Sequence, residues 1–137
     1  MDISTWQGYA FEQVCLHHIQ QIKRKLGING ILSNVCTYSW PAFTDRNGKN
    51  HRGGQIDLIL DRGDKTINLC EMKYADGEYE LDADECAKMQ NRREMFVRRT
   101  DTTKGIQMTM VTPCGLKRNK YWGRVQKVVT ADDLFKE

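Results

Sequence analysis

The sequence predicts one α/β domain with three layers, in which helices cover both faces of a central mixed sheet. The 137 residues are enough for a single domain with a core of its own, so residues 1–137 are expected to fold as one unit. Apolar residues recur with helical spacing in two segments and in strand-like runs in five others. The order is helix, three strands, helix and two strands, and the natural solution is a sheet covered on both faces.

The first helix is expected over residues 4–26 and ends at Gly27, which tolerates the left-handed backbone of a helix end. Glu12 lies at the edge of its apolar stripe, where a carboxylate can be half covered. The stripe consists of Phe11, Val14, Cys15, Ile22 and Leu26.

Residues 31–40 have strand character, and residues 42–54 then read as a loop rich in turn-forming residues. The loop also carries the basic side chains of Arg46, Lys49 and Arg52. Such a segment is usually solvated, but a basic loop beside a catalytic strand is also what a phosphate-binding flap would look like. Arg52 is therefore a candidate substrate-binding residue.

The two strongest strands are residues 55–61 and 66–74, joined by a short turn into a hairpin. If the turn centres on Asp64, Asp57 lies opposite Glu71, because each is seven residues from the centre. Cross-strand neighbours have Cβ atoms about 4.5–5.5 Å apart. Lys73 is two residues beyond Glu71 and shares its face. Three ionisable side chains are thus expected to converge at one end of the hairpin.

Two carboxylates and an ammonium among apolar neighbours are costly unless a partner neutralises them. A divalent cation would relieve the repulsion between Asp57 and Glu71, and Mg²⁺ suits a few carboxylates plus water. Such an ion, with Mn²⁺ as a substitute for Mg²⁺, polarises phosphodiester oxygens and helps to generate hydroxide. Lys73 would position the attacking water or stabilise developing charge. The competing interpretation is an ordinary salt bridge between Lys73 and one of the acids.

A second long helix is expected over residues 82–99, with Asp82 as its N-cap and Glu85 in capping-box position. Residues 106–112 alternate as a strand, residues 124–130 form another, and residues 131–135 give a final helical turn.

The acidic motifs resemble a known superfamily. The run Gly54-Gln55-Ile56-Asp57-Leu58, followed by Cys70-Glu71-Met72-Lys73-Tyr74, resembles motifs II and III of the PD-(D/E)XK nucleases. The segment Trp6-Gln7-Gly8-Tyr9-Ala10-Phe11-Glu12 resembles the acid-bearing first helix of that superfamily. The resemblance implies a restriction-endonuclease-like α/β/α sandwich. More narrowly, nearly the whole chain, including Val129-Thr130-Ala131-Asp132-Asp133-Leu134-Phe135 at its end, resembles the C-terminal nuclease-like domain of a group of bacterial AAA-type ATPases.

The resemblance implies a role for each matching residue. Asp57 and Glu71 would bind the metal, Lys73 would be catalytic, and Glu12 would support the metal directly or through water. A further polar residue on the second long helix would be Gln90 or Lys88. These two, together with Gln55 and Arg52, are candidates for contact with substrate.

The expected function is therefore a divalent-metal-dependent nuclease, a hydrolase of phosphodiester bonds, with DNA as the foremost substrate. The chain has no Walker-type phosphate-binding loop, so an AAA-type ATPase would be a separate module. The alternative from another class is a non-cleaving module that binds nucleic acid or a protein partner within such an ATPase system.

The remaining features bound these expectations. A net charge of +3 is compatible with nucleic acid without arguing for it. The basic clusters are usually solvated surface, although some should contact phosphates if a nuclease site is present. They lie at 23–25, 92–99 and 117–124. Tyr121 and Trp122, near the last cluster, are expected to pack in the core rather than stack on a base.

The histidine pair and the cysteines are potential metal ligands, but neither group is expected to bind a metal ion. His17 and His18 are adjacent on a helix and point about 100° apart, so one should pack and the other face solvent. The five cysteines are widely spaced without a C-x-x-C pair, which favours free thiols and a reducing compartment over zinc. No apolar run reaches the length of about 18 residues that a membrane span needs, and no signal peptide is evident, so a cytoplasmic protein is expected.

Overall fold

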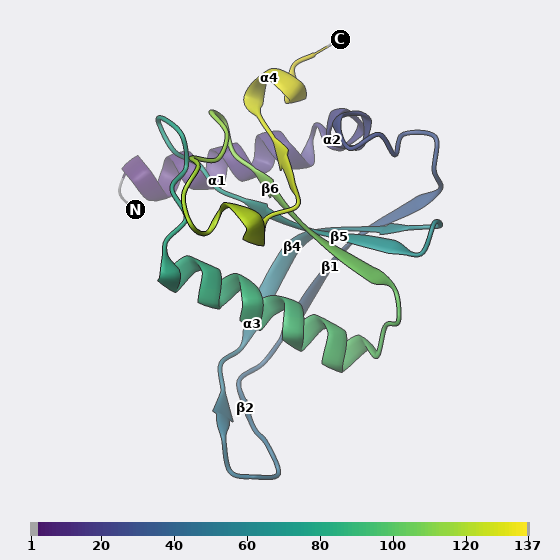
Figure 1. The fold of residues 1–137 in the computed structure, drawn as a ribbon, viewed down its shortest axis with the longest axis vertical. Coiled ribbons are helices and arrows are strands. Elements are labelled where there is room, and N and C mark those ends of the chain that lie inside the picture. Colours follow the sequence, from purple (N-terminus) through teal and green to yellow (C-terminus); the bar gives the residue numbers. More distant parts are fainter. Residues whose placement is uncertain (1–2, 137) are drawn as a thin grey trace.

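The computed structural model describes residues 3–136 and has three layers around a five-stranded sheet (Figure 1). The strand order is β1-β4-β5-β6-β7, with antiparallel pairing from β1 through β5 and parallel pairing from β5 through β7. The sheet is therefore mixed, as predicted. The strands are β1 (Ser33–Trp40), β4 (Gly54–Arg62), β5 (Thr66–Met72), β6 (Gly105–Val111) and β7 (Lys127–Val129).

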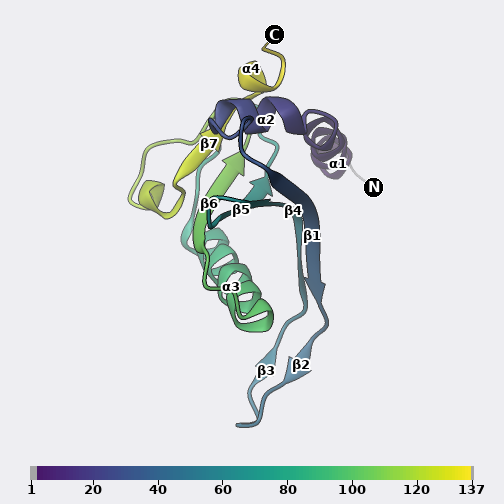
Figure 2. The same ribbon diagram turned by 90° about the vertical axis from the view of Figure 1, so that its right-hand side faces the viewer.

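Helices cover both faces of the sheet (Figure 2), which confirms the predicted α/β/α class. One face carries α3 (Ala83–Thr100) and the other carries α1 (Ile3–Leu16), α2 (Ile19–Lys25) and α4 (Ala131–Leu134). The α3-side core contains Ile56, Ile59, Leu69, Met95, Phe96 and Met110. The α1-side core contains Cys15, Ile22, Leu58, Leu60, Cys70 and Leu134.

The N-terminal helix is interrupted, contrary to the single helix predicted over residues 4–26. The ring Nδ1 of His18 lies 2.6 Å from the carbonyl oxygen of Val14, which a continuing helix would pair with the backbone N–H of His18. That N–H instead donates to Cys15 O at 3.0 Å. His17 is exposed, whereas the His18 ring packs edge-on against Phe135. The two imidazoles thus divide as predicted.

The predicted loop over residues 42–54 contains a short hairpin, which we call the arm. Its strands are β2 (Phe43–Thr44) and β3 (Asn50–His51), and it projects beyond the end of the sheet (Figures 1 and 2). Asp45 closes the turn, because its carboxylate accepts hydrogen bonds from two backbone N–H groups and lies 2.9 Å from His51 Nε2. These bonds hold the pKa of Asp45 below its usual value.

The other element boundaries shift by a few residues. β5 ends at Met72, before the predicted residue 74, although Lys73 N still donates to Val111 O at 2.9 Å. The predicted strand at 124–130 shortens to β7, preceded by the 3-10 turn η1 (Trp122–Arg124). Trp122 is partly exposed at 39%, so its predicted place in the core is wrong.

The five thiols are free. Cys15 is fully buried, and loss of solvation raises its pKa to about 12. Within residues 3–136, none of the helices has the length and apolar character required to span a membrane.

Candidate active site

The β4–β5 hairpin has the register that the sequence predicted. Its ladder of paired residues runs from Asp61 opposite Ile67 to Leu58 opposite Cys70. Asp57 and Glu71 stand one step further along each strand, just beyond the last pair of the ladder. The short turn determined this register, because a tight hairpin fixes which residues oppose each other.

A β-bulge in β4 changes where Asp57 points. On the β1 side of β4, Cys36 pairs with Ile59 but Tyr38 pairs with Ile56, so three steps of β4 oppose two of β1. Ile56 and Ile59 therefore both enter the α3-side core, which strict alternation would forbid. Bulges often re-aim a side chain beside a functional site. The assumption that Asp57 and Glu71 share one face is corrected by this irregularity.

Asp57 is directed toward α1, where its carboxyl group lies within hydrogen-bonding range of Glu12. Its other contact is from the same strand, since Gln55 Nε2 donates to Asp57 Oδ1 at 2.6 Å. Burial and the adjacent negative charge of Asp57 raise the pKa of Glu12, while the ammonium of Lys73 opposes that rise. The result is a pair of close carboxyl groups, which we call the acid pair. The sequence assigned Glu12 a supporting role, and the structure brings its carboxyl group beside that of Asp57.

Glu71 is directed toward α3. Its Oε2 lies 2.9 Å from Nη1 of Arg92, and its side chain is only 12% exposed. Burial raises the pKa of Glu71, and the positive charges of Arg92 and Lys73 act against that rise. Glu71 therefore already has a cationic partner on the neighbouring helix.

Lys73 links the two groups of acids. Its Nζ lies 2.8 Å from Oε1 of Glu85. Its positive charge also opposes the rise in the pKa of both Glu12 and Glu71. Arg92 Nη1 is also 4.0 Å from Glu85 Oε1. The hairpin and α3 thus share a network of two acids and two bases, with the acid pair on the α1 side of Lys73.

Sequence reasoning missed the part played by Glu85 and Arg92. Glu85 was assigned to a capping box, and its backbone N–H does donate to Asp82 Oδ1 at 2.8 Å. Its carboxylate, however, is used by Lys73 rather than by the cap. The available signal was spacing, because Glu85 and Arg92 are seven residues apart and lie on one face of α3.

The predicted polar residues of α3 lie elsewhere. Gln90 donates to Glu94 at 3.1 Å on an exposed part of the helix, away from the network. Lys88 is exposed and lies 3.6 Å from Asp84. The α3 side chains that pair with Lys73 and Glu71 are Glu85 and Arg92.

Lys88 and Arg52 meet at a hollow beside this network. Trp40, Gly53, Gly54, Asn91 and Arg92 complete its lining. Gly54 permits the close approach of the Trp40 ring, because a Cβ added there would lie 2.5 Å from that ring. The indole Nε1 in turn donates to the backbone oxygen of Arg52 at 3.1 Å. The hollow thus connects the arm to the ion-pair network.

The acid pair fits a small divalent cation in its donor chemistry. Mg²⁺ commonly binds through one or two carboxylates and completes its shell with water. Glu12 and Asp57 supply two such groups, and their mutual repulsion is what a cation would relieve. Among residues 3–136, no group of three or more histidine, cysteine, aspartate or glutamate side chains is arranged to hold a metal ion. Glu71 would join the acid pair only after leaving Arg92.

Comparisons with protein-family models and with curated proteins give no match. Among solved structures, the chain is similar to the crystal structure of a protein of unknown function, AF1548, with a TM-score of 0.47 and 18% sequence identity. The similarity covers 87% of this chain and 56% of that one, so the chain spans little more than half the length of the other protein.

Proposed function

We propose that the chain is a divalent-metal-dependent phosphodiesterase that cleaves nucleic acid, with DNA as its foremost substrate. The observation that carries the proposal is that Lys73 lies close enough to both Glu12 and Glu71 for its charge to act on each, at the end of a bulged hairpin. Carboxylates and a lysine in one partly buried cluster are the groups that hydrolysis of a phosphodiester needs. The resemblance of the same residues to PD-(D/E)XK motifs supports this assignment.

The metal would be held by Glu12 and Asp57, with Glu71 as a further ligand. A bound Mg²⁺ or Mn²⁺ would polarise the phosphodiester and favour ionisation of a nearby water. Gln55 keeps Asp57 oriented, because its amide donates to one carboxylate oxygen and leaves the other available.

Lys73 would act on the reacting groups. Its ammonium can orient the attacking water or stabilise the negative charge that grows on the phosphoryl oxygens. The water oxygen forms the new bond to phosphorus, the bond to the leaving oxygen breaks, and the leaving oxygen takes up a proton. Arg92, whose guanidinium lies at the edge of the hollow, is suited to bind a phosphate oxygen as that charge develops.

A second candidate function is a non-cleaving module that binds nucleic acid or a protein partner, such as an AAA-type ATPase. The observation that favours it is that Lys73 and Glu71 are each paired with a side chain of α3. Such pairs neutralise both groups and give them a structural use. Cleavage of nucleic acid distinguishes the two functions, because the enzyme would turn over its substrate and the binding module would not.

The test is incubation of the purified chain with plasmid DNA, single-stranded DNA and RNA in Mg²⁺ or Mn²⁺, beside Asp57→Asn and Lys73→Met. Lys117→Met is the matched control, because Lys117 is also paired with a glutamate, Glu80 at 3.7 Å, but at an exposed site. Cleavage by the wild type and the control that is lost in both site variants is expected. An inert wild type, or cleavage that survives in both variants, would reject the enzyme in favour of the module.

A further inference from the structure

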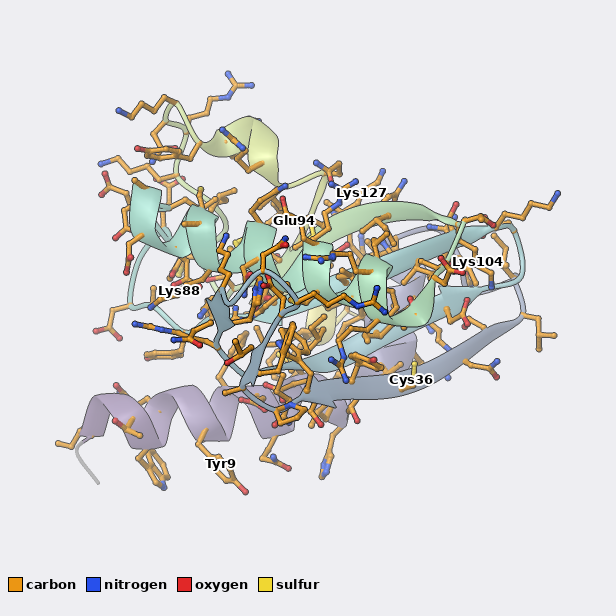
Figure 3. All side chains as sticks on the ribbon, turned by 90° about the horizontal axis from the view of Figure 1, so that it is seen from below. Tyr9, Cys36, Lys88, Glu94, Lys104 and Lys127 are labelled. Carbon is orange, nitrogen blue, oxygen red and sulfur yellow. The ribbon has the colours of Figure 1, made fainter. Side chains whose placement is uncertain are left out.

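The arm and α3 enclose a basic groove, which we call the arm groove. One hollow lies between β3 and the middle of α3, and it shares Arg52, Lys88 and Asn91 with the hollow beside the ion-pair network. The shared lining makes the two hollows neighbours. Figure 3, seen from the arm end of the molecule, shows the arm in front of α3, on which Lys88 and Glu94 are labelled.

Cations without an acidic partner stand on both walls of this groove. Lys49 and Arg52 come from the arm and Arg98 from α3, and all three side chains are exposed. None of them takes part in an ion pair among residues 3–136. Of the acids in the groove, Asp84 pairs with Lys88, whereas Glu94 accepts only from the neutral amide of Gln90 and keeps its charge. The three cations outnumber this one carboxylate, so the groove carries an excess of positive charge.

The arm is held in place against α3. The rings of Phe43 and His51 stack with centroids 4.6 Å apart, and the guanidinium of Arg99 lies 5.7 Å from the Phe43 centroid. His51 is also anchored to Asp45 at the turn. Because the stack joins β2 to β3 and Arg99 links Phe43 to α3, the backbone of the arm is already placed with its cations across the groove from those of α3. Binding would then require ordering of the side chains more than of the backbone.

The groove leads into the candidate active site. Arg92 lines its inner end and is the residue that holds Glu71 at 2.9 Å. The basic cluster at 117–124 is partly committed, because Lys117 pairs with Glu80 and Arg118 lies over the Trp122 ring. The cluster at 23–25 lies on α2, which covers the opposite face of the sheet from α3. Position beside the ion-pair network thus singles out the arm groove among the basic surfaces.

We propose that the arm groove binds the sugar-phosphate backbone of a nucleic-acid strand and directs it toward Glu71 and Lys73. Unpartnered Lys and Arg side chains on two walls are suited to a chain of phosphates, and contacts of this kind set affinity without reading sequence. The direction of the strand toward Glu71 and Lys73 rests on the proposed function. Binding of nucleic acid in the arm groove, however, does not depend on cleavage. DNA and RNA share this chemistry, so the test includes both.

The test measures binding without metal. Fluorescence anisotropy of labelled single-stranded DNA, duplex DNA and RNA is followed in EDTA over a series of salt concentrations. The groove variant carries Lys49→Ala, Arg52→Ala and Arg98→Ala. The matched control carries Lys117→Ala, Arg118→Ala and Lys120→Ala, which remove the same number of positive charges from another surface. Circular dichroism confirms that both variants fold.

We expect at least one of the nucleic acids to bind and the groove variant to lower the slope of log affinity against log salt by roughly 2–3, about one for each lost phosphate contact. Its affinity at low salt should fall at least roughly tenfold. Equal losses in the groove variant and the control, or no loss in the groove variant, would overturn the proposal. So would failure of all three nucleic acids to bind the wild type. Since the assay contains no metal, a chain that binds through the groove but never cleaves would reject only the proposed enzymatic function.

Discussion

Replacing Arg92 by alanine tests the ion-pair network most sharply. The substitution removes the guanidinium that lies 2.9 Å from Glu71, a carboxylate that is 12% exposed. Lys73 remains nearby but is already 2.8 Å from Glu85. Glu71 would therefore keep its burial and lose its closest positive charge.

The size of the effect follows from that geometry. Removing one partner of a fully buried ion pair costs about 3–5 kcal/mol, because the other charge is left in a medium that solvates it poorly. Here the Arg92 side chain is 25% exposed, so water can partly replace it. We expect the free energy of unfolding at pH 7.5 to fall by about 2–3 kcal/mol.

The pH dependence of this loss has a defined sign. Burial raises the pKa of Glu71 above its usual 4.5, and loss of Arg92 should raise it further. A carboxyl whose pKa is higher in the folded state favours folding while it is protonated, at and below its unfolded pKa, and loses that contribution as the pH rises through the folded value. The deficit of Arg92→Ala should therefore be largest at neutral pH and shrink toward pH 4.5.

Urea unfolding at pH 7.5 and at pH 4.5 measures this deficit. Arg98→Ala, on an exposed part of the same helix, is the matched control for loss of an arginine and for helix propensity. Glu71→Gln combined with Arg92→Ala should recover part of the stability, because the uncompensated charge is gone. A deficit no larger than that of Arg98→Ala, or one that grows on acidification, would refute the network as described.

Three further outcomes are expected. Gly54→Ala should destabilise the protein by about 1–3 kcal/mol in urea unfolding, because its Cβ would lie 2.5 Å from the Trp40 ring. Asp57→Asn should raise the free energy of unfolding at pH 7.5 by no more than about 1 kcal/mol, because it removes the charge that repels Glu12 while water screens this partly exposed pair. Cys15, with its pKa near 12, should resist alkylation at pH 8 until the protein unfolds, as mass spectrometry would show.

Each of these outcomes has a matched comparison. Gly77→Ala places its Cβ in open space and should change stability little, so equal losses at the two glycines would contradict the role of Gly54. Asp76→Asn removes an exposed carboxylate and should not stabilise the protein as Asp57→Asn does. Cys114 is exposed and should be alkylated in the native state; equal rates at Cys15 would show that Cys15 is not buried.

The sequence determined the hairpin but not its bulge. A tight turn fixes register, so the opposition of Asp57 and Glu71 along the backbone could be predicted. Residues 58–60 are apolar on both faces of β4, because each face meets its own core. In such a run apolar and polar residues do not alternate. An extra residue at a bulge therefore leaves the apolar pattern of the sequence unchanged.

The arm and the helix break escaped prediction for related reasons. The arm is held by the polar contacts of Asp45 and by the Phe43–His51 stack rather than by an apolar pattern. At the helix break, the apolar stripe continues across His18, while the ring of His18 contacts Val14 O and its backbone N–H donates to Cys15 O. Tertiary and side-chain contacts that compete with backbone hydrogen bonds are invisible to periodicity.

The site was predicted in composition more fully than in geometry. Asp57, Glu71, Lys73 and Glu12 all lie in one neighbourhood, but the sequence paired Asp57 with Glu71, whereas the fold places Asp57 beside Glu12. The difference arises because the bulge in β4 turns Asp57 toward α1, while α3 supplies a partner for Glu71. Partners from a helix more than ten residues away along the chain are set by packing, which the strand pattern does not contain.

The most direct test of the central claim is a titration with Mn²⁺ without nucleic acid, in which electron paramagnetic resonance reports the free ion. It compares the wild type with Asp57→Asn and Glu12→Gln, because we propose that the acid pair binds the cation. The account predicts saturable binding at one site and a loss of affinity in each variant that is at least roughly 10–100-fold. Absence of saturable binding in the wild type, or equal affinity in all three proteins, would contradict it.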